Sequence, residues 1–310
     1  MMNGHLPVLL TECINYLNIK PDGVYVDGTL GMGGHSEEIL RRLTTGRLIA
    51  IDRDLVAVER AGERLSPYKD RLTVVHGNFR DVADILADLG VSGVSGMLFD
   101  LGVSSPQLDE SERGFSYMTD APLDMRMDGT DKVDAWFIVN HWPEEKLRRI
   151  FWDFGEERFS PRIAAAIVAR RAEKEIQTTL ELVDVIKSAM PAAALREKQH
   201  PAKRSFQAIR IAVNDELSAV SSMMERAPDC LAPGGRLAVI SFHSLEDRIV
   251  KNAIQAREKG CTCPREAPVC TCGFVRTLKS VTRKPVTATG EELETNPRAR
   301  SAKLRVAEHV

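Results

Sequence analysis

Along the first hundred residues, short apolar runs alternate with segments whose apolar positions recur at helical spacing. Short apolar runs with the length of buried strands lie at residues 24–27, 48–52, 72–76 and 96–101. Segments with apolar positions three or four residues apart, typical of amphipathic helices, lie at residues 36–43, 54–65 and 81–89. Repeated strand–helix units of this kind predict a mostly parallel sheet with right-handed crossovers.

The alternation of strands and helices stops after Asp100. Residues 104–135 are polar and turn-rich, and three helical patterns then begin at Pro143, Ser160 and Thr178 with no strand pattern between them. We therefore predict a helical domain at residues 107–204, inserted into an α/β core that residues 1–106 and 205–310 form together.

The α/β pattern returns with a long amphipathic segment at residues 206–226, which predicts one helix. After it we expect a tight turn, a strand, a helix that opens with a capping box of Ser244 and Asp247, and two edge strands that pair antiparallel. These elements are expected at residues 231–236, 237–242, 244–254, 281–287 and 302–306.

A glycine-rich loop follows the first predicted strand, where Gly28, Gly31, Gly33 and Gly34 come directly after Asp27. Glycine lets the backbone approach a ligand closely, but this spacing differs from the G-x-G-x-x-G of dinucleotide sites. Asp27 would repel a pyrophosphate and suits a positively charged group, such as the amino group of a methionine. Asp52 closes the second strand, where a carboxylate accepts hydrogen bonds from ribose hydroxyls. The loop therefore favours S-adenosylmethionine over NAD.

Polar or aromatic side chains stand at the carboxyl ends of the predicted parallel strands, where ligands bind in such sheets. They are Asp27, Asp52, Asn78 with Phe79, and Asp100. Their coincidence at one edge is more specific than any one of them, since a lone acid there also serves as a loop cap.

The net charge of −2 excludes a globally basic surface, so contacts with nucleic acid must come from local patches. Two basic stretches, residues 196–204 and 298–305, supply such patches, with Lys203, Arg204, Arg298 and Arg300 as candidate phosphate ligands. A solvated charged face is the alternative. No membrane-spanning run or secretory pattern is present, and we expect a cytoplasmic protein, a monomer or a homodimer.

Four of the six cysteines form two C-x-C pairs, Cys261 with Cys263 and Cys270 with Cys272. Four thiolates can bind zinc tetrahedrally, although the usual spacing is C-x-x-C. A structural zinc, a reversible disulfide and plain thiols all stay open.

Nine segments along nearly the whole chain carry a family resemblance. They are residues 5–10, 27–35, 100–109, 112–116, 122–128, 155–158, 205–208, 241–248 and 296–301. On these, and on the Pro-Gly-Gly turn at 233–235, the chain resembles the bacterial small-subunit ribosomal RNA methyltransferase H family. The resemblance implies a class I, Rossmann-like methyltransferase fold with an inserted helical substrate-recognition domain.

The resemblance also implies the activity, which is methylation of N4 of a cytidine in the decoding centre of 16S rRNA, within the small ribosomal subunit. S-adenosylmethionine would pass its methyl group directly to the base. The implied cofactor contacts are Gly33, Gly34, His35, Asp52, Phe79, Asp100 and Gln107.

The loop that begins at Ser104 is similar to the Ser-Pro-Pro-Tyr loop of amino-methyltransferases, which grips an amino group. Ser105 and Pro106 are therefore candidate catalytic residues, but Gln107 stands where that loop has an aromatic residue. His243 is a further candidate near the base, and its alternative is a helix-entry histidine bonded to the backbone. An NAD-dependent oxidoreductase and a non-catalytic RNA-binding module are the competing functions.

Overall fold

The computed structural model describes residues 6–104, 107, 110–263 and 271–310. Its contacts divide the chain into two compact units. The core unit contains residues 1–102 and 217–310, and the helical unit contains residues 103–216. The sequence placed these boundaries after residues 106 and 204, so the second one lies twelve residues later than expected.

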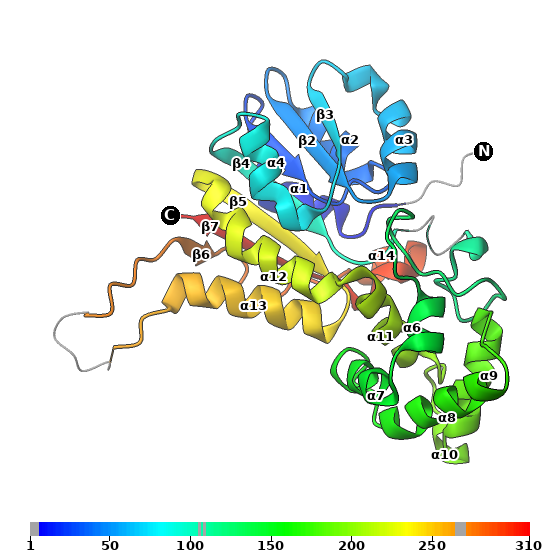
Figure 1. Ribbon diagram of the computed structural model, residues 1–310. Coiled ribbons are helices and arrows are strands. Elements are labelled where there is room, and N and C mark those ends of the chain that lie inside the picture. Colours follow the sequence, from blue (N-terminus) through cyan, green and yellow to red (C-terminus); the bar gives the residue numbers. More distant parts are fainter. Residues whose placement is uncertain (1–5, 105–106, 108–109, 264–270) are drawn as a thin grey trace. The chain divides into compact units, whose positions relative to one another are not determined.

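The core unit is built on a sheet whose strand order is β3-β2-β1-β4-β5-β7-β6 among the described residues (Figure 1). The first five strands in this order are parallel, whereas β7 pairs antiparallel with both β5 and β6. The strands are β1 (Val24–Asp27), β2 (Arg47–Asp52), β3 (Leu72–His76), β4 (Val94–Asp100), β5 (Leu231–Ser241), β6 (Leu278–Ser280) and β7 (Lys303–His309). The predicted parallel strands and the antiparallel edge are confirmed.

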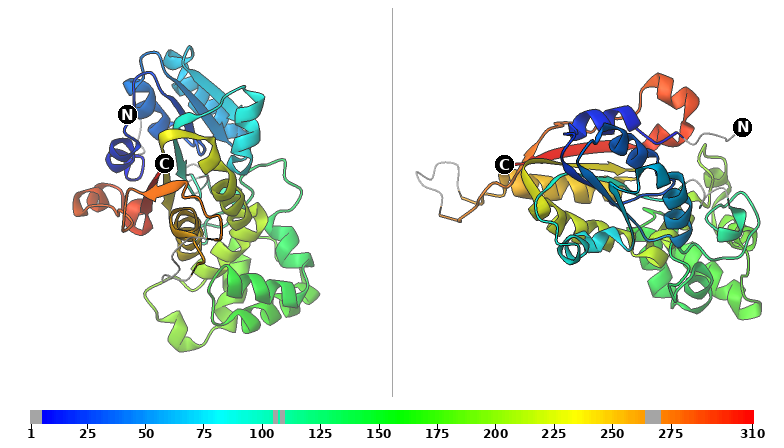
Figure 2. Two further views of the ribbon diagram at one scale, coloured as in Figure 1. Left: turned by 90° about the vertical axis from the view of Figure 1, so that its left-hand side faces the viewer. Right: turned by 90° about the horizontal axis from the view of Figure 1, so that it is seen from above.

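Helices cover both faces of this sheet, because neighbouring residues of each strand point to opposite sides. Leu48 and Ala50 of β2 pack in one apolar cluster with helices α1 to α3, while Ile49 and Ile51 pack in another with α4, α12 and α13. Figure 2 shows α1 and α4 on opposite sides of the sheet. The helices are α1 (Leu10–Leu17), α2 (Gly34–Arg42), α3 (Leu55–Arg64), α4 (Val82–Asp88), α12 (Glu216–Arg226), α13 (Ser244–Lys259) and α14 (Gly290–Thr295).

Two predicted elements near the sheet edge are wrong. The tight turn expected at 231–236 is a bulge inside β5, because Leu231 pairs with Val94 and the next paired residue, Arg236, lies opposite Gly96. The strand expected at 281–287 is replaced by β6 at 278–280. Residues 281–287 contribute one isolated bridge, from Val286, and the preceding Pro285 has no N–H for a ladder.

The helical unit packs around its own apolar core, to which Ile138, Phe151, Ile163 and Leu182 contribute fully buried side chains. Its described helices are α6 (Ala135–His141), α7 (Glu144–Asp153), α8 (Ser160–Glu173), α9 (Thr179–Ala189), α10 (Ala192–Leu195) and α11 (Lys203–Asn214). The three predicted helix starts are confirmed, and the hydroxyl of Thr178 caps α9. Helix α6, in contrast, follows a turn-rich stretch and was not expected.

The single helix predicted at 206–226 is two helices, α11 and α12. Asp215 between them has φ 49°, a left-handed conformation that ends an α-helix. The guanidinium of Arg210 reaches across this break and donates two 2.8 Å hydrogen bonds to the carboxylate of Glu216. Helix α11 therefore belongs to the helical unit, which explains the later boundary.

Asn214, at the end of α11, binds the loop of residues 122–128 within the helical unit. Its Oδ1 accepts a 2.8 Å hydrogen bond from the N–H of Met127, and its Nδ2 donates to the carbonyls of Met125 and Arg210. The side chain is 2% exposed, so these backbone groups have little access to water.

We predict that Asn214→Ala lowers the free energy of unfolding by about 2–4 kcal/mol, since it leaves a buried N–H and a buried carbonyl unpaired. Urea unfolding followed by circular dichroism measures this loss. Ser221→Ala is the control, because Ser221 is exposed and its hydroxyl donates only to a carbonyl of its own helix. Equal effects of the two substitutions would contradict the role given to Asn214.

Candidate functional site

The glycine-rich loop between β1 and α2 is shaped mainly by close packing within the protein. A Cβ on Gly28 would lie 2.2 Å from the ring of Phe99, and one on Gly34 would lie 2.3 Å from Pro7. Gly33 caps α2 with φ 76°. Gly31 differs, because it has φ 50° and the nearest atom to its Cβ position is 3.9 Å away. The loop thus presents open backbone at Gly31.

Asp27 at the end of β1 holds this loop. One carboxylate oxygen accepts a 3.1 Å hydrogen bond from the N–H of Thr29, and the other accepts a 2.7 Å bond from the hydroxyl of Ser36. The side chain is 1% exposed, and burial raises its pKa. The sequence led us to expect Asp27 against the positive group of a ligand. Its carboxylate is instead turned into the loop, a role for which spacing alone gives no signal.

Asp52 at the end of β2 faces the open part of the same loop. Its Oδ2 accepts a 2.7 Å hydrogen bond from the N–H of Gly31, and its Oδ1 accepts a 2.9 Å bond from the N–H of Asp54. Burial, together with the nearby charges of Asp54 and Asp27, raises the pKa of Asp52 to about 6. Each oxygen retains a second lone pair, so this fixed carboxylate can accept two further donors.

Asp100 lies at the end of β4, and one of its carboxylate oxygens is buried. Its backbone N–H donates to the hydroxyl of Thr29 at 2.6 Å, and its Oδ2 lies 3.8 Å from Nδ1 of His35. Its Oδ1 has no hydrogen-bond partner among the described residues. Burial and the charges of Asp27 and Glu246 raise the pKa of Asp100 well above its usual value. Buried carboxylate oxygens are rarely left unpaired, so this one indicates a donor or cation supplied by a ligand.

Two further predicted contacts accompany these acids in the core unit. His35 lies in the first turn of α2, 5% exposed, with Nε2 3.1 Å from the carbonyl oxygen of Val8. Phe79 follows β3 and meets Phe99 edge to face, with ring centroids 6.0 Å apart. Both follow carboxyl ends of parallel strands, as do the acids.

The loop that follows β4 belongs to the helical unit. Gln107 is 4% exposed, and its Oε1 accepts a 2.9 Å hydrogen bond from the N–H of Ser104. Ser105 and Pro106, the candidate catalytic residues of this loop, lie outside the described residues.

His243 is the N-cap of α13. Its Nδ1 accepts from the N–H of Glu246 at 3.5 Å, and Glu246 Oε2 accepts from the N–H groups of Phe242 and His243. The capping box therefore begins at His243, one residue before the predicted Ser244, and Asp247 pairs with Arg305 instead. This arrangement matches the alternative named for His243, a helix-entry histidine bonded to the backbone.

The candidate phosphate ligands are exposed side chains of both units. Lys203 and Arg204 begin α11 in the helical unit, where Arg204 also donates to the carbonyl of Glu156. Arg298 and Arg300 lie in the short 3-10 turn η5 (Pro297–Ser301) of the core unit. The three described cysteines of the C-x-C pairs lie close together, and Cys270 lies outside the described residues.

The topology and the site define the class of protein. Five parallel strands ordered 3-2-1-4-5, followed by an antiparallel strand beside β5, with acids after β1, β2 and β4, are the arrangement of class I methyltransferases, which use S-adenosylmethionine. No described helix combines the length and the apolar character needed to cross a lipid bilayer.

Comparison with known proteins gives the family. The chain belongs to the MraW methylase family, whose model matches residues 2–310. It is 59% identical over 307 residues to the ribosomal RNA small subunit methyltransferase H of Brevibacillus brevis, covering 99% of this chain and 98% of that one. The protein of the same name from Heliobacterium mobile is 54% identical, with 99% of each chain covered. A solved structure of a putative rRNA-methylase from Clostridium thermocellum is similar with a TM-score of 0.47 and 10% identity, covering 99% of this chain and 100% of that one.

We predict that Ser36→Ala destabilises the protein by about 1–3 kcal/mol near neutral pH, because it removes a hydrogen bond to a buried carboxylate. The substitution raises the already raised pKa of Asp27 further. The loss is therefore largest where Asp27 is ionised, and it shrinks as the pH falls through the pKa and the acid takes up a proton.

Urea unfolding at about pH 8 and about pH 5 measures the two values. Ser205→Ala is the matched control, since Ser205 is fully buried and its hydroxyl has no partner among the described residues. We expect that control to be neutral at both pH values. A pH-independent loss in Ser36→Ala would contradict the link to Asp27.

Proposed function

We propose that this protein transfers a methyl group from S-adenosylmethionine to N4 of a cytidine in the decoding centre of 16S rRNA. The observation that carries the cofactor assignment is a buried carboxylate oxygen of Asp100 that has no partner among the described residues, together with Asp52 at the end of another parallel strand. Acids here favour a ligand with positive charge, whereas the pyrophosphate of NAD would be repelled. Membership of the methylase family, and relatives named for the small-subunit rRNA, support the reaction and its substrate.

The residues of the core unit fit this cofactor. Asp52, its orientation fixed by two backbone N–H groups, would accept both ribose hydroxyls. Asp100, with His35, would face the positively charged methionine part, beside the open backbone of Gly31. Gly33 and Gly34 set the path of that backbone, and Phe79 would lie against the adenine. The cofactor supplies a methyl group on a sulfonium, which a nucleophile can attack in line.

The acceptor amino group needs help from the protein, because the lone pair of cytosine N4 is delocalised into the ring. Groups that accept hydrogen bonds from its two N–H groups turn that lone pair toward the methyl group and hold the two reactants in line. We propose Ser105 and Pro106 for this task, in a loop that Gln107 ties back to Ser104. His243 would have a positioning role, because its Nδ1 already accepts the capping hydrogen bond of α13 and so fixes the chain that follows β5.

We propose the helical unit as the substrate-recognition domain. A hollow of about 320 Å³ on this unit is lined by Arg148, Arg149 and Trp152, with Glu145, Asp153, Ser160 and Pro161. Trp152 is 61% exposed, which is unusual for so large an apolar side chain. An exposed aromatic face beside cations suits stacking with an unpaired base. Lys203 and Arg204 of this unit, and Arg298 and Arg300 of the core unit, would hold phosphates.

We predict that binding of S-adenosylmethionine weakens as the pH falls below about 6, approaching tenfold per pH unit for each carboxylate that must first lose a proton. Since the pKa values of Asp52 and Asp100 are raised, binding of a cation near pH 6 should release protons. Asp52→Asn and Asp100→Asn should each weaken binding about 10- to 100-fold and reduce that release.

Titration calorimetry in two buffers of different ionisation enthalpy measures both the affinity and the proton release. Asp88→Asn is the control, because Asp88 is an exposed acid at the end of α4 and should leave both unchanged. An affinity that stays constant between about pH 5 and 7, without proton release, would mean that neither carboxylate contacts the cofactor.

We predict that the protein, given labelled S-adenosylmethionine and small ribosomal subunits from a strain that lacks the enzyme, labels one cytidine-containing fragment of 16S rRNA. Mass spectrometry of the digested nucleosides should show N4-methylcytidine. Asp100→Asn should abolish the label at low cofactor concentration, and Asp88→Asn should retain it. Cofactor binding without any N4-methylcytidine would overturn the proposed substrate.

A further inference from the structure

The described residues between α13 and β6, 260–263 and 271–277, form no apolar core of their own. None of them is buried, and Val275 is 75% exposed. Figure 1 shows the described residues as two extended pieces of chain, one leaving the end of α13 and the other returning to β6, which we together call the arm. A short chain segment without a core needs a disulfide, a metal or a partner to hold one conformation.

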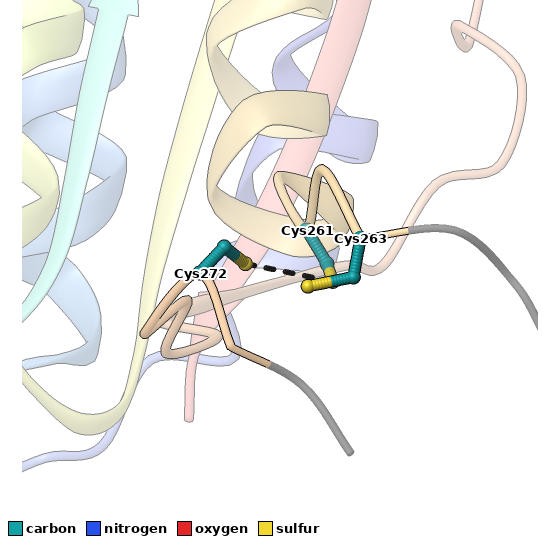
Figure 3. Close-up of side chains that lie close together, drawn as sticks. All are labelled: Cys261, Cys263 and Cys272. Atoms are coloured by element: carbon teal, nitrogen blue, oxygen red, sulfur yellow. Dashed lines mark hydrogen bonds between the residues drawn. The ribbon is translucent and has the colours of Figure 1, made fainter. Parts of the chain in front are cut away.

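Three cysteines of the arm bring their sulfur atoms together. The Sγ atoms of Cys261, Cys263 and Cys272 all lie within 4.8 Å of one another, and Figure 3 shows them converging from the two pieces of the arm. The sulfurs of Cys261 and Cys272 are 3.6 Å apart, and all three residues are reduced thiols. Cys272 thus meets two cysteines that precede it by eleven and nine residues.

The separation of the sulfurs matches a metal site. With Zn–S bonds of about 2.3 Å, two thiolates of a tetrahedral zinc ion lie about 3.8 Å apart. A disulfide would require the same two atoms at about 2.05 Å. Three converging sulfurs, moreover, exceed what a single disulfide uses.

Thr271 places two hydrogen-bonding groups beside the sulfur of Cys263. The backbone N–H of Thr271 donates to this Sγ at 3.3 Å, and the hydroxyl of Thr271 lies 3.7 Å away. Donors of this kind orient metal ligands.

We propose that Cys261, Cys263 and Cys272 bind a structural zinc ion that orders the arm. Thiolates are soft ligands that bind zinc in preference to magnesium or calcium. A structural zinc ion has four ligands in all. Cys270 is the candidate that the sequence offers for that position, but it lies outside the described residues and the proposal rests on the other three.

The place of the arm in the fold makes this zinc structural. Helix α13 begins after the carboxyl end of β5 and runs for 16 residues, about 24 Å, before the arm begins. The acids of the candidate cofactor site lie at the carboxyl ends of the strands, where α13 starts. Zinc in the arm is therefore remote from the methyl transfer, and its removal should leave cofactor affinity unchanged.

The test is the metal content of the full-length protein, purified under reducing conditions without chelator or metal-affinity resin. Mass spectrometry of the metals should find about one zinc per chain. Cys261→Ser and Cys272→Ser should each lower the zinc content at least tenfold. Cys230→Ser is the matched control, because Cys230 lies outside the arm, and it should keep its zinc.

A second measurement does not depend on the variants. Cobalt(II) exchanged into the wild-type protein should give the intense visible bands of a tetrahedral site and a thiolate-to-cobalt charge-transfer band. Unchanged affinity for S-adenosylmethionine shows that the variants are folded. Wild-type protein without zinc and without these cobalt bands overturns the proposal, as does unchanged zinc content in Cys261→Ser and Cys272→Ser. In protein purified without reductant, a peptide map showing Cys261 joined to Cys272 would overturn the proposal in favour of a disulfide.

Discussion

The candidate cofactor site depends on the hydrogen bonds that join the glycine-rich loop to the ends of three parallel strands. Asp27 of β1 accepts from Thr29 and Ser36, the hydroxyl of Thr29 accepts from the backbone of Asp100, and Gly31 donates to Asp52. Each of these hydrogen bonds involves the last residue of a strand, and the sheet already holds that residue in place. The loop is thereby fixed by the sheet, and the carboxylates reach their positions before any ligand arrives.

This arrangement has an electrostatic cost. Asp27 is buried, and Asp52 and Asp100 are half-buried. The charge of Asp27 adds to the burial that raises the pKa of both Asp52 and Asp100. Hydrogen bonds from the loop compensate Asp27 and part of Asp52, whereas Asp100 Oδ1 has no such partner among the described residues. Burying unpaired negative charge destabilises the folded protein, and a cationic ligand removes that penalty. In the function proposed here, the feature that weakens the free protein would provide affinity for the cofactor and select against anionic ones.

The sequence predicted those parts of the fold that depend on local pattern. Short apolar runs predicted the parallel strands, and apolar positions at helical spacing predicted the helices between them. The glycine-rich loop, Asp52 and Asp100 indicated the edge of the sheet at which the candidate site lies. The sequence could not show why glycine is needed at these positions. A side chain at Gly28 would clash with Phe99 and one at Gly34 with Pro7, and both contacts join residues distant in sequence. The break at Asp215 was missed for a similar reason: apolar spacing continues across it, and a non-glycine residue adopts the left-handed conformation there.

A one-residue shift in a cap shows how local geometry changes the interpretation of a candidate. Ser244 and Asp247 satisfy the pattern of a capping box, but His243 and Glu246 form it, and Glu246 is 1% exposed. A buried carboxylate needs donors, and the N–H groups of Phe242 and His243 supply them at the end of β5. Asp247 takes no part in the cap, and its carboxylate accepts two hydrogen bonds from Arg305 of the antiparallel strand β7. His243 thus joins the end of β5 to the start of α13, and any effect of its substitution on catalysis includes the displacement of that junction.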